Sequence, residues 1–115
     1  MTVTVRYYYI MKGKTELIII NKKQDGEKLT VQMAGRLDTQ TAPQLETELK
    51  EGLNGVKELV FDLKEVEYIS SAGLRVLLYA QKVMNKQGSM VVCNVQEDIQ
   101  EIFEVTGFVD ILTIV

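Results

Sequence analysis

The sequence contains no histidine and only one cysteine among its 115 residues. Without histidine, the chain lacks the usual general base, any Ser-His-Asp triad and the usual imidazole ligand of a metal ion. A single thiol cannot build a zinc site of several cysteines, and the scattered carboxylates do not follow the spacing of a calcium-binding loop. The sequence therefore predicts a protein that is not an enzyme and that holds neither a metal ion nor a cofactor.

Long apolar runs and a basic-then-apolar signal segment at the N-terminus are also absent. The longest apolar runs are far shorter than the roughly 18 residues that a membrane-spanning helix needs. The lone Cys93 lies between Val91-Val92 and Asn94-Val95, which is typical of a small buried strand residue and not of a reactive thiol. We therefore expect a soluble protein of the reducing cytoplasm, with no membrane span.

Positive charge is too dispersed for a nucleic-acid surface. The 13 basic and 16 acidic side chains are intermixed, and the formal net charge is −3. No extended basic stripe is available for a phosphate backbone, so we expect no direct nucleic-acid binding. With 46% hydrophobic residues, a chain of this length can bury about two thirds of its unfolded surface, which predicts one compact domain. No heptad pattern demands a dimer, so a monomer is favoured and a dimer is left open.

In residues 1–10, Val3 and Val5 alternate with threonines, a pattern that suits either an edge strand or an ordered tail. Residues 17–21 and 29–34 then predict two antiparallel strands, because Asp25-Gly26 between them is a strong hairpin turn. Further along, Thr41-Ala42-Pro43-Gln44 has the spacing of a capping box with proline in the first helical turn. The sequence therefore predicts that a helix begins near Thr41.

That helix should bury one leucine stripe, formed by Leu45, Leu49 and Leu53, and end at the glycines 52 and 55. The continuous apolar run in residues 58–63 predicts a central strand covered on much of both faces. A deeply packed helix from Ser71 to Gly88 and a strand over residues 89–95 follow.

The last quarter of the chain predicts a helix that begins at Asp98 and is capped by Gly107, and a closing strand over residues 108–115. The expected order is strand, strand, helix, strand, helix, strand, helix, strand. This order indicates an α/β fold with a mixed sheet of about four or five strands and helices mainly on one face.

Between the central strand and the second helix lies Tyr68-Ile69-Ser70-Ser71-Ala72-Gly73-Leu74. Small residues in the first turn of a helix leave backbone N–H groups uncovered, and these donors and the helix dipole together favour an anion such as phosphate. Serine is also a preferred N-cap residue. The local pattern alone favours structural capping over a regulatory hydroxyl.

Four short motifs change that balance when they are taken together. They are Gly35-Arg36-Leu37-Asp38, Val60-Phe61-Asp62-Leu63, Ile69-Ser70-Ser71-Ala72-Gly73-Leu74 and Phe103-Glu104-Val105-Thr106-Gly107-Phe108. Over residues 16–112 the chain resembles the STAS domain, named for sulfate transporters and anti-sigma factor antagonists, and above all its stand-alone bacterial members. The resemblance divides the chain into an N-terminal extension or edge strand (1–15) and a STAS domain (16–115).

The resemblance implies a regulator that is phosphorylated by a partner that is both an anti-sigma factor and a serine kinase. The usual family motif is Asp-Ser-Ser/Thr-Gly, so the phosphoacceptor falls on Ser71, with Ser70 as the second choice. Ser70 then stands where the family has aspartate, and Ala72 where it has a second hydroxyl. The partner-binding residues that the resemblance implies are Arg36, Asp38, Ser70, Ser71, Gly73, Leu74 and Arg75.

Several alternatives stay open at this point. Asp38 also suits a helix cap, and Arg36 and Arg75 also suit solvated surface positions. The whole domain could be a scaffolding subunit of a transport or sensory assembly in which Ser71 is never phosphorylated. A small enzyme with Ser71 as nucleophile is the third hypothesis, and the missing histidine argues against it.

Overall fold

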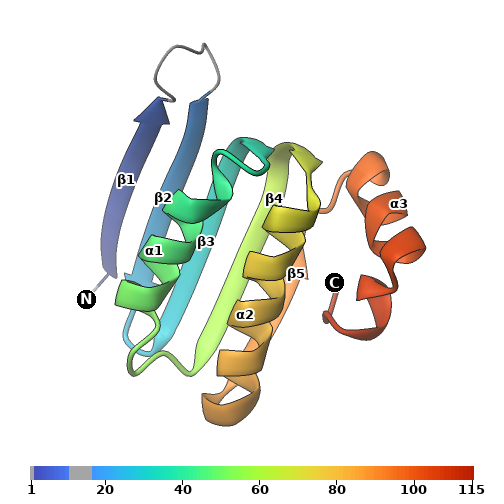
Figure 1. The fold of residues 1–115 in the computed structure, drawn as a ribbon. Helices are drawn as coiled ribbons and strands as arrows, with labels where there is room; N and C mark the ends of the chain where they lie inside the picture. The colour runs from blue at the N-terminus through green and yellow to red at the C-terminus, as the bar shows by residue number, and fades with distance from the viewer. Residues whose placement is uncertain (1, 11–16) are drawn as a thin grey trace.

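The computed structural model of this protein describes residues 2–10 and 17–115 (Figure 1). The strands are β1 (Thr2–Ile10), β2 (Leu17–Asp25), β3 (Lys28–Leu37), β4 (Glu58–Ile69) and β5 (Ser89–Cys93). The helices are α1 (Ala42–Gly52), α2 (Ser71–Gln87), α3 (Glu97–Thr106) and a short 3-10 turn, η1 (Phe108–Asp110). The predicted α/β class with a mixed sheet is confirmed.

The five strands form one sheet in the order β1-β2-β3-β4-β5. β1, β2 and β3 pair antiparallel, whereas β3, β4 and β5 pair parallel. Gly26 forms the predicted hairpin turn between β2 and β3, with a φ of 63° that glycine adopts without steric cost. The parallel pairs need crossover connections, which α1 and α2 supply.

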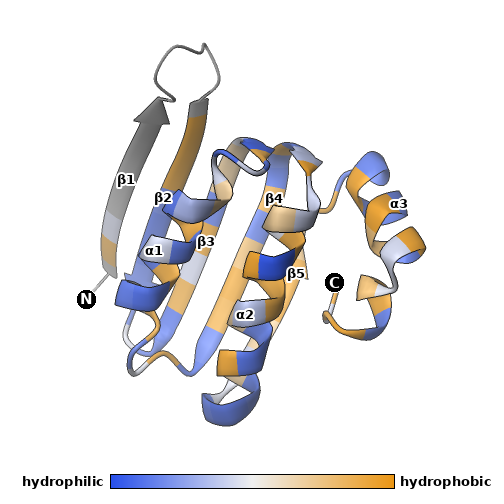
Figure 2. Ribbon diagram, in the orientation of Figure 1, coloured by the Kyte–Doolittle hydropathy of each residue, from blue (hydrophilic) through white to orange (hydrophobic). Residues whose placement is uncertain are grey.

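α1 and α2 lie side by side on one face of the sheet (Figure 1). The predicted stripe of Leu45, Leu49 and Leu53 is buried there, and Phe61 and Leu63 of β4 lie in the same core. The outward side of α1 is mostly hydrophilic, whereas β5 is mostly hydrophobic (Figure 2). The core therefore lies between this helix pair and the sheet.

The prediction that residues 58–63 are covered on much of both faces is only half right. Leu59, Phe61 and Leu63 are buried, but the alternate residues Val60 and Asp62 are only half-buried. The difference follows from the position of α1 and α2, which both pack on the same side of the sheet. Because the run contains only one polar residue, the sequence did not show which face of β4 would be less covered.

The C-terminal segment differs from its prediction. Residues 108–115 do not form a closing strand: Phe108–Asp110 form the 3-10 turn η1, and only Ile114 makes a single parallel bridge, to Val92 of β5. Gly107 caps α3 as predicted, with a φ of 81°. This left-handed residue leads directly into the tight turn, so too few residues remain for an extended ladder.

Two other boundaries shift by a few residues. β5 ends at Cys93 and not at Val95, because Asn94 has a φ of 56°, which breaks the extended backbone. α3 begins at Glu97, one residue before the predicted Asp98.

Residues 2–10 form an edge strand of the sheet. β1 pairs with β2 along its whole length, from Thr2 opposite Asp25 to Ile10 opposite Leu17. Of the two predictions for this segment, the edge strand is the one observed. Residues 11–16, which include the boundary between the predicted extension and the STAS domain, lie outside the described residues, so that division stays a prediction. In the described part of the chain, no helix has the length and apolarity to cross a membrane.

Candidate functional site

The candidate site lies where β3 and β4 end. Because these strands are parallel, their carboxyl ends meet at one edge of the sheet, and the starts of α1 and α2 follow there (Figure 1). Leu37 lies opposite Ile69 in the ladder, and the Ser70 N–H donates to the Leu37 carbonyl over 2.9 Å. The two motifs that the sequence singled out, residues 35–38 and 69–74, are therefore in direct contact.

The two serines at the start of α2 have different environments. Ser70 is the N-cap: its backbone is extended, and its hydroxyl oxygen accepts a long hydrogen bond of 3.5 Å from the Gly73 N–H. Ser71 is the first residue of the helix and is exposed. Among the described residues, none forms a hydrogen bond with the Ser71 hydroxyl. The capping function and the free hydroxyl thus belong to different residues.

At Gly73, α2 packs closely against the end of β3. A Cβ at this position would lie 2.7 Å from the Leu37 carbonyl oxygen and 2.8 Å from the Leu37 Cγ. Gly73 is buried, and the next residue, Leu74, is only 7% exposed. Both residues therefore support the site from beneath, and a side chain at Gly73 would crowd the backbone.

The start of α1 corrects the predicted capping box. Thr41 is the N-cap of α1, but its side chain makes no cap hydrogen bond. Thr41 is only 1% exposed, and its hydroxyl donates to the Arg36 carbonyl and accepts from the Asp38 N–H over 2.9 Å. The spacing from Thr41 to Gln44 was a misleading signal, because the end of β3 offers Thr41 closer partners than the helix does.

Asp38 stabilises the turn between β3 and α1. Its Oδ1 accepts hydrogen bonds from the N–H groups of Gln40 and Thr41, over 3.0 and 3.2 Å. Burial acts to raise the pKa of Asp38, but these hydrogen bonds, the Thr41 hydroxyl and the charge of Arg36 together lower the pKa below its ordinary value. The carboxylate is therefore ionised near neutral pH and is engaged by the turn that leads into α1.

Arg36 and Tyr68 form a pair that sequence reasoning missed. They lie opposite each other in the β3–β4 ladder, and the Arg36 guanidinium lies 4.4 Å from the centre of the Tyr68 ring. The Arg36 Nε also lies 3.6 Å from the Asp38 Oδ2. Tyr68 stood in the predicted motif, but its partner could be identified only once the strand register was known. The pair places a partly exposed cation at this edge of the sheet.

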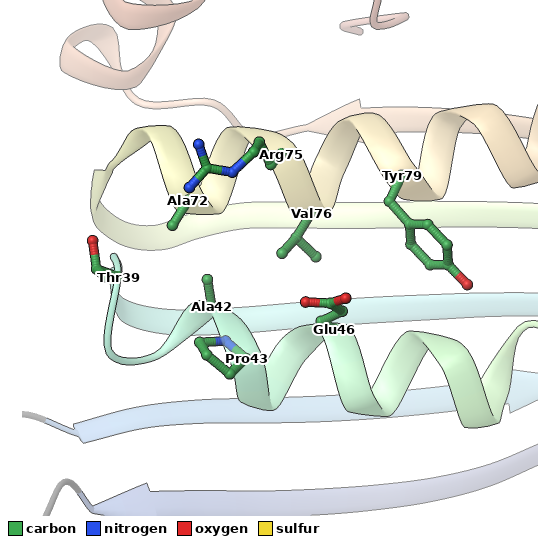
Figure 3. Close-up of a pocket in the computed structure, with 8 residues that line it drawn as sticks. All are labelled: Thr39, Ala42, Pro43, Glu46, Ala72, Arg75, Val76 and Tyr79. Carbon is green, nitrogen blue, oxygen red and sulfur yellow. The ribbon is translucent and has the colours of Figure 1, made fainter.

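A groove runs between α1 and α2, beside the start of α2 (Figure 3). Its volume is about 410 Å³. It is lined by residues from both helices and from the turn before α1, namely Thr39, Ala42, Pro43, Glu46, Ala72, Arg75, Val76 and Tyr79. Of the predicted site residues, only Arg75 lines this groove, and its neighbour Ala72 directly follows Ser71. In the residues that the structure describes, no cluster of side chains suits a metal ion.

Comparison with known proteins decides the family. The sequence profile of the STAS domain matches residues 19–115. The chain belongs to the STAS domain family. The matched region begins within β2 and continues to Val115, whereas β1 precedes it.

Two relatives illustrate the similarity in sequence. The chain is 39% identical over 84 residues to BtrV of Bordetella bronchiseptica, assigned as an anti-sigma factor antagonist, a match that covers 71% of this chain and 72% of that protein. It is 34% identical over 98 residues to the anti-sigma-B factor antagonist of Bacillus subtilis, covering 84% and 90%. The chain is therefore similar to anti-sigma factor antagonists over most of its length.

Solved structures share the fold. An anti-sigma factor antagonist from Mycobacterium paratuberculosis superimposes with a TM-score of 0.77 at 23% identity, over 84% of both chains. The unphosphorylated form of SpoIIAA, an anti-sigma factor antagonist, superimposes with a TM-score of 0.73 at 13% identity, over 84% of this chain and 87% of SpoIIAA. The phosphorylated form of SpoIIAA from Bacillus gives a TM-score of 0.67 over 84% and 90% of the two chains, also at 13% identity. At these identities the likeness concerns the fold.

Proposed function

We propose that this protein is an anti-sigma factor antagonist that works as a partner switch. The unphosphorylated form binds an anti-sigma factor that is also a serine kinase, and the sigma factor is thereby released for transcription. Phosphorylation of Ser71 by that kinase ends the binding. The protein acts by binding and not by catalysis, and it works in the cytoplasm. The similarity to antagonists of this class over most of their length supports the proposal.

The observation that carries the proposal is the exposed hydroxyl of Ser71 at the start of α2, which forms no hydrogen bond with any described residue. A kinase must reach its acceptor oxygen, and an exposed first-turn residue meets this need. Ser70 is a poorer acceptor because it is half-buried and its oxygen caps the helix. The serine that replaces the family aspartate therefore has a structural role of its own.

The remaining predicted contact residues lie at the end of β3 or at the start of α2. We propose that the contact surface consists of Arg36, Asp38, Ser70, Ser71 and Arg75, with Gly73 and Leu74 holding it in position from within. Of these, Arg36, Ser71 and Arg75 are exposed, whereas Asp38 is engaged by the turn that leads into α1. The partner then meets a surface made by the end of β3, the turn that follows it and the start of α2.

A phosphoryl group on Ser71 is tolerated by the fold and opposed at the contact surface. It adds about 1.5 to 2 negative charges at neutral pH, which takes the protein from −3 to about −5. At the start of α2 the helix dipole and unpaired N–H groups favour this charge. The first turn of α2 contains no acidic residue that would repel the phosphate. Charge and bulk act against docking.

Mass spectrometry tests the assignment of Ser71. The protein is incubated with ATP and an extract of its native cells, and phosphopeptides are mapped. We expect one phosphate on Ser71 in the wild type and in Ser70→Ala, and none in Ser71→Ala. Phosphate on Ser70, or none on any serine, would contradict the proposal and favour a scaffolding role. The same phosphorylation assay then guides purification of the kinase.

A further inference from the structure

The groove between α1 and α2 has a floor suited to an apolar side chain. Ala42 is 3% exposed and Val76 is 5% exposed, so both form part of the packed interior. Ala42 and Ala72 face each other across the groove with single methyl groups (Figure 3). Longer side chains at these two positions would occupy part of the space of about 410 Å³ that the structure leaves between the helices. Pockets of this kind receive the anchoring side chains of protein partners.

The charges on the rim of the groove are unbalanced. Glu46 is paired with Lys50 over 3.0 Å, one helical turn further along α1. Arg75 is exposed, and no ion pair joins it to a carboxylate of the described residues. In Figure 3 its guanidinium extends toward Ala72 and the start of α2, while Glu46 and Tyr79 lie further along the groove. The end of the groove nearest Ser71 therefore carries a positive charge that is not neutralised.

We propose that this groove is a docking site for the anti-sigma factor, which inserts an apolar side chain between Ala42, Ala72 and Val76 and places a neighbouring carboxylate on Arg75. The inference rests on the proposed function, because it assigns the partner to the same contact surface. Complementary charge supports this occupant. In a partner segment that carries an apolar and an acidic residue side by side, the apolar side chain packs on the floor of the groove and the carboxylate pairs with Arg75. Ser71 immediately precedes Ala72, so the docked segment lies beside the phosphorylation site.

The position of Arg75 also connects phosphorylation to the groove. Arg75 is four residues after Ser71, so the two side chains lie on the same side of α2 in successive turns. A phosphate on Ser71 offers Arg75 an intramolecular partner with up to two negative charges, and arginine pairs with phosphate through two parallel hydrogen bonds. In the phosphorylated protein Arg75 binds this phosphate and is withdrawn from the carboxylate of the partner. Phosphorylation then blocks docking through a loss of attraction as well as through repulsion.

Titration calorimetry with the purified kinase, in the absence of ATP, tests the docking site. Arg75→Gln should weaken binding about tenfold, the factor equivalent to about 1.4 kcal/mol. Ala72→Leu, which fills the groove with an apolar side chain, should weaken binding by at least the same factor. The control for Arg75→Gln is Lys82→Gln, which also removes one positive charge but from exposed α2 surface outside the groove, and Lys82→Leu places a leucine at that same outside position. Both controls should bind within about twofold of the wild type.

The role of Arg75 is tested by combining variants. Ser71→Asp and Arg75→Gln should weaken binding by less together than the product of their separate effects, because both remove the same interaction. Thermal melts of each variant show whether it is folded. If the wild type binds the kinase but Arg75→Gln binds like Lys82→Gln, the groove assignment is wrong and the proposed switch stands. Fully multiplicative effects would contradict the withdrawal of Arg75. If the kinase does not bind the unphosphorylated wild type, both proposals are wrong.

Discussion

The starts of α1 and α2 differ in how they use a hydroxyl side chain. Thr41 precedes α1 and is buried, and its hydroxyl forms hydrogen bonds with the Arg36 carbonyl and the Asp38 N–H. Ser71 begins α2, is exposed, and has a hydroxyl with no partner among the described residues. The two helix starts lie at the same edge of the sheet (Figure 1). A hydroxyl that holds the fold and a hydroxyl available for regulation are thus distinguished by burial and hydrogen bonding, and not by residue type.

The largest effect is expected from Gly73→Val, which attacks the packing beneath Ser71. The new side chain would meet the Leu37 carbonyl at a distance that no real Cβ adopts without a shift. We expect a loss of about 3 kcal/mol in the free energy of unfolding, at the upper end for overpacking. Urea denaturation measures it. Ala72→Val is the control, since it places the same branched side chain one residue earlier at a half-buried position; equal losses in the two variants would disprove the tight contact.

Thr41→Val and Ser71→Val compare the two hydroxyls directly. Thr41→Val keeps the shape but leaves the Arg36 carbonyl and the Asp38 N–H without their partner, at a cost of about 2 kcal/mol. Ser71→Val removes no hydrogen bond of the described structure, so only the lower helix propensity of valine, a few tenths of a kcal/mol, remains. Chemical denaturation of both variants measures the difference. The comparison between the helix starts fails if Ser71→Val is as destabilising as Thr41→Val.

Ser70→Ala should have an intermediate effect. Loss of an N-cap side chain costs about 1 kcal/mol, and the 3.5 Å hydrogen bond places Ser70 toward the lower part of the usual range. Thermal unfolding should show a small decrease in Tm, whereas Ser71→Ala should leave Tm nearly unchanged. A larger decrease for Ser71→Ala would exchange the roles assigned to the two serines.

The smallest expected effect concerns the pH dependence of Asp38. Its pKa is lowered in the folded protein by hydrogen bonds from the turn and by Arg36, against the opposing effect of burial. The resulting stabilisation is present above the pKa of the unfolded state, about 3.9, and is lost as the pH falls through the lower pKa of the folded state. The stability of the wild type should therefore approach that of Asp38→Asn below about pH 4. A stability difference that does not change between pH 7 and pH 3 would contradict this role.

Much of the architecture follows from local sequence signals. The leucines at every fourth position of α1, the continuous apolar run of β4 and the Asp25-Gly26 turn each predicted the observed element. These signals are sufficient because the spacing of apolar residues along the chain directly shows which helix face or which strand is buried. The segment 108–115 was mispredicted because its apolar residues pack around a tight turn after Gly107, and periodicity does not report such a turn.

The site was predictable in part. Gly73 and Ser71 could be singled out because small residues and hydroxyls at a helix start have a direct physical use. The partners of Thr41, the contact of Arg36 with Tyr68 and the groove beside Ala72 depend on which strands are neighbours and in what register. Such contacts join residues that are far apart in the chain, so a local pattern such as the apparent capping box at Thr41 cannot reveal them.

The measurement that tests the switch most directly is titration of the purified kinase with Ser71→Asp, beside a thermal melt of the same variant. A negative charge at the start of α2 should keep or raise stability, by about 0.3 to 1 kcal/mol. The same charge lies on the proposed contact surface, so binding should weaken at least a hundredfold, equivalent to about 2.8 kcal/mol. Ser71→Ala should bind like the wild type. A folded Ser71→Asp protein that binds the kinase as tightly as the wild type would contradict the partner switch.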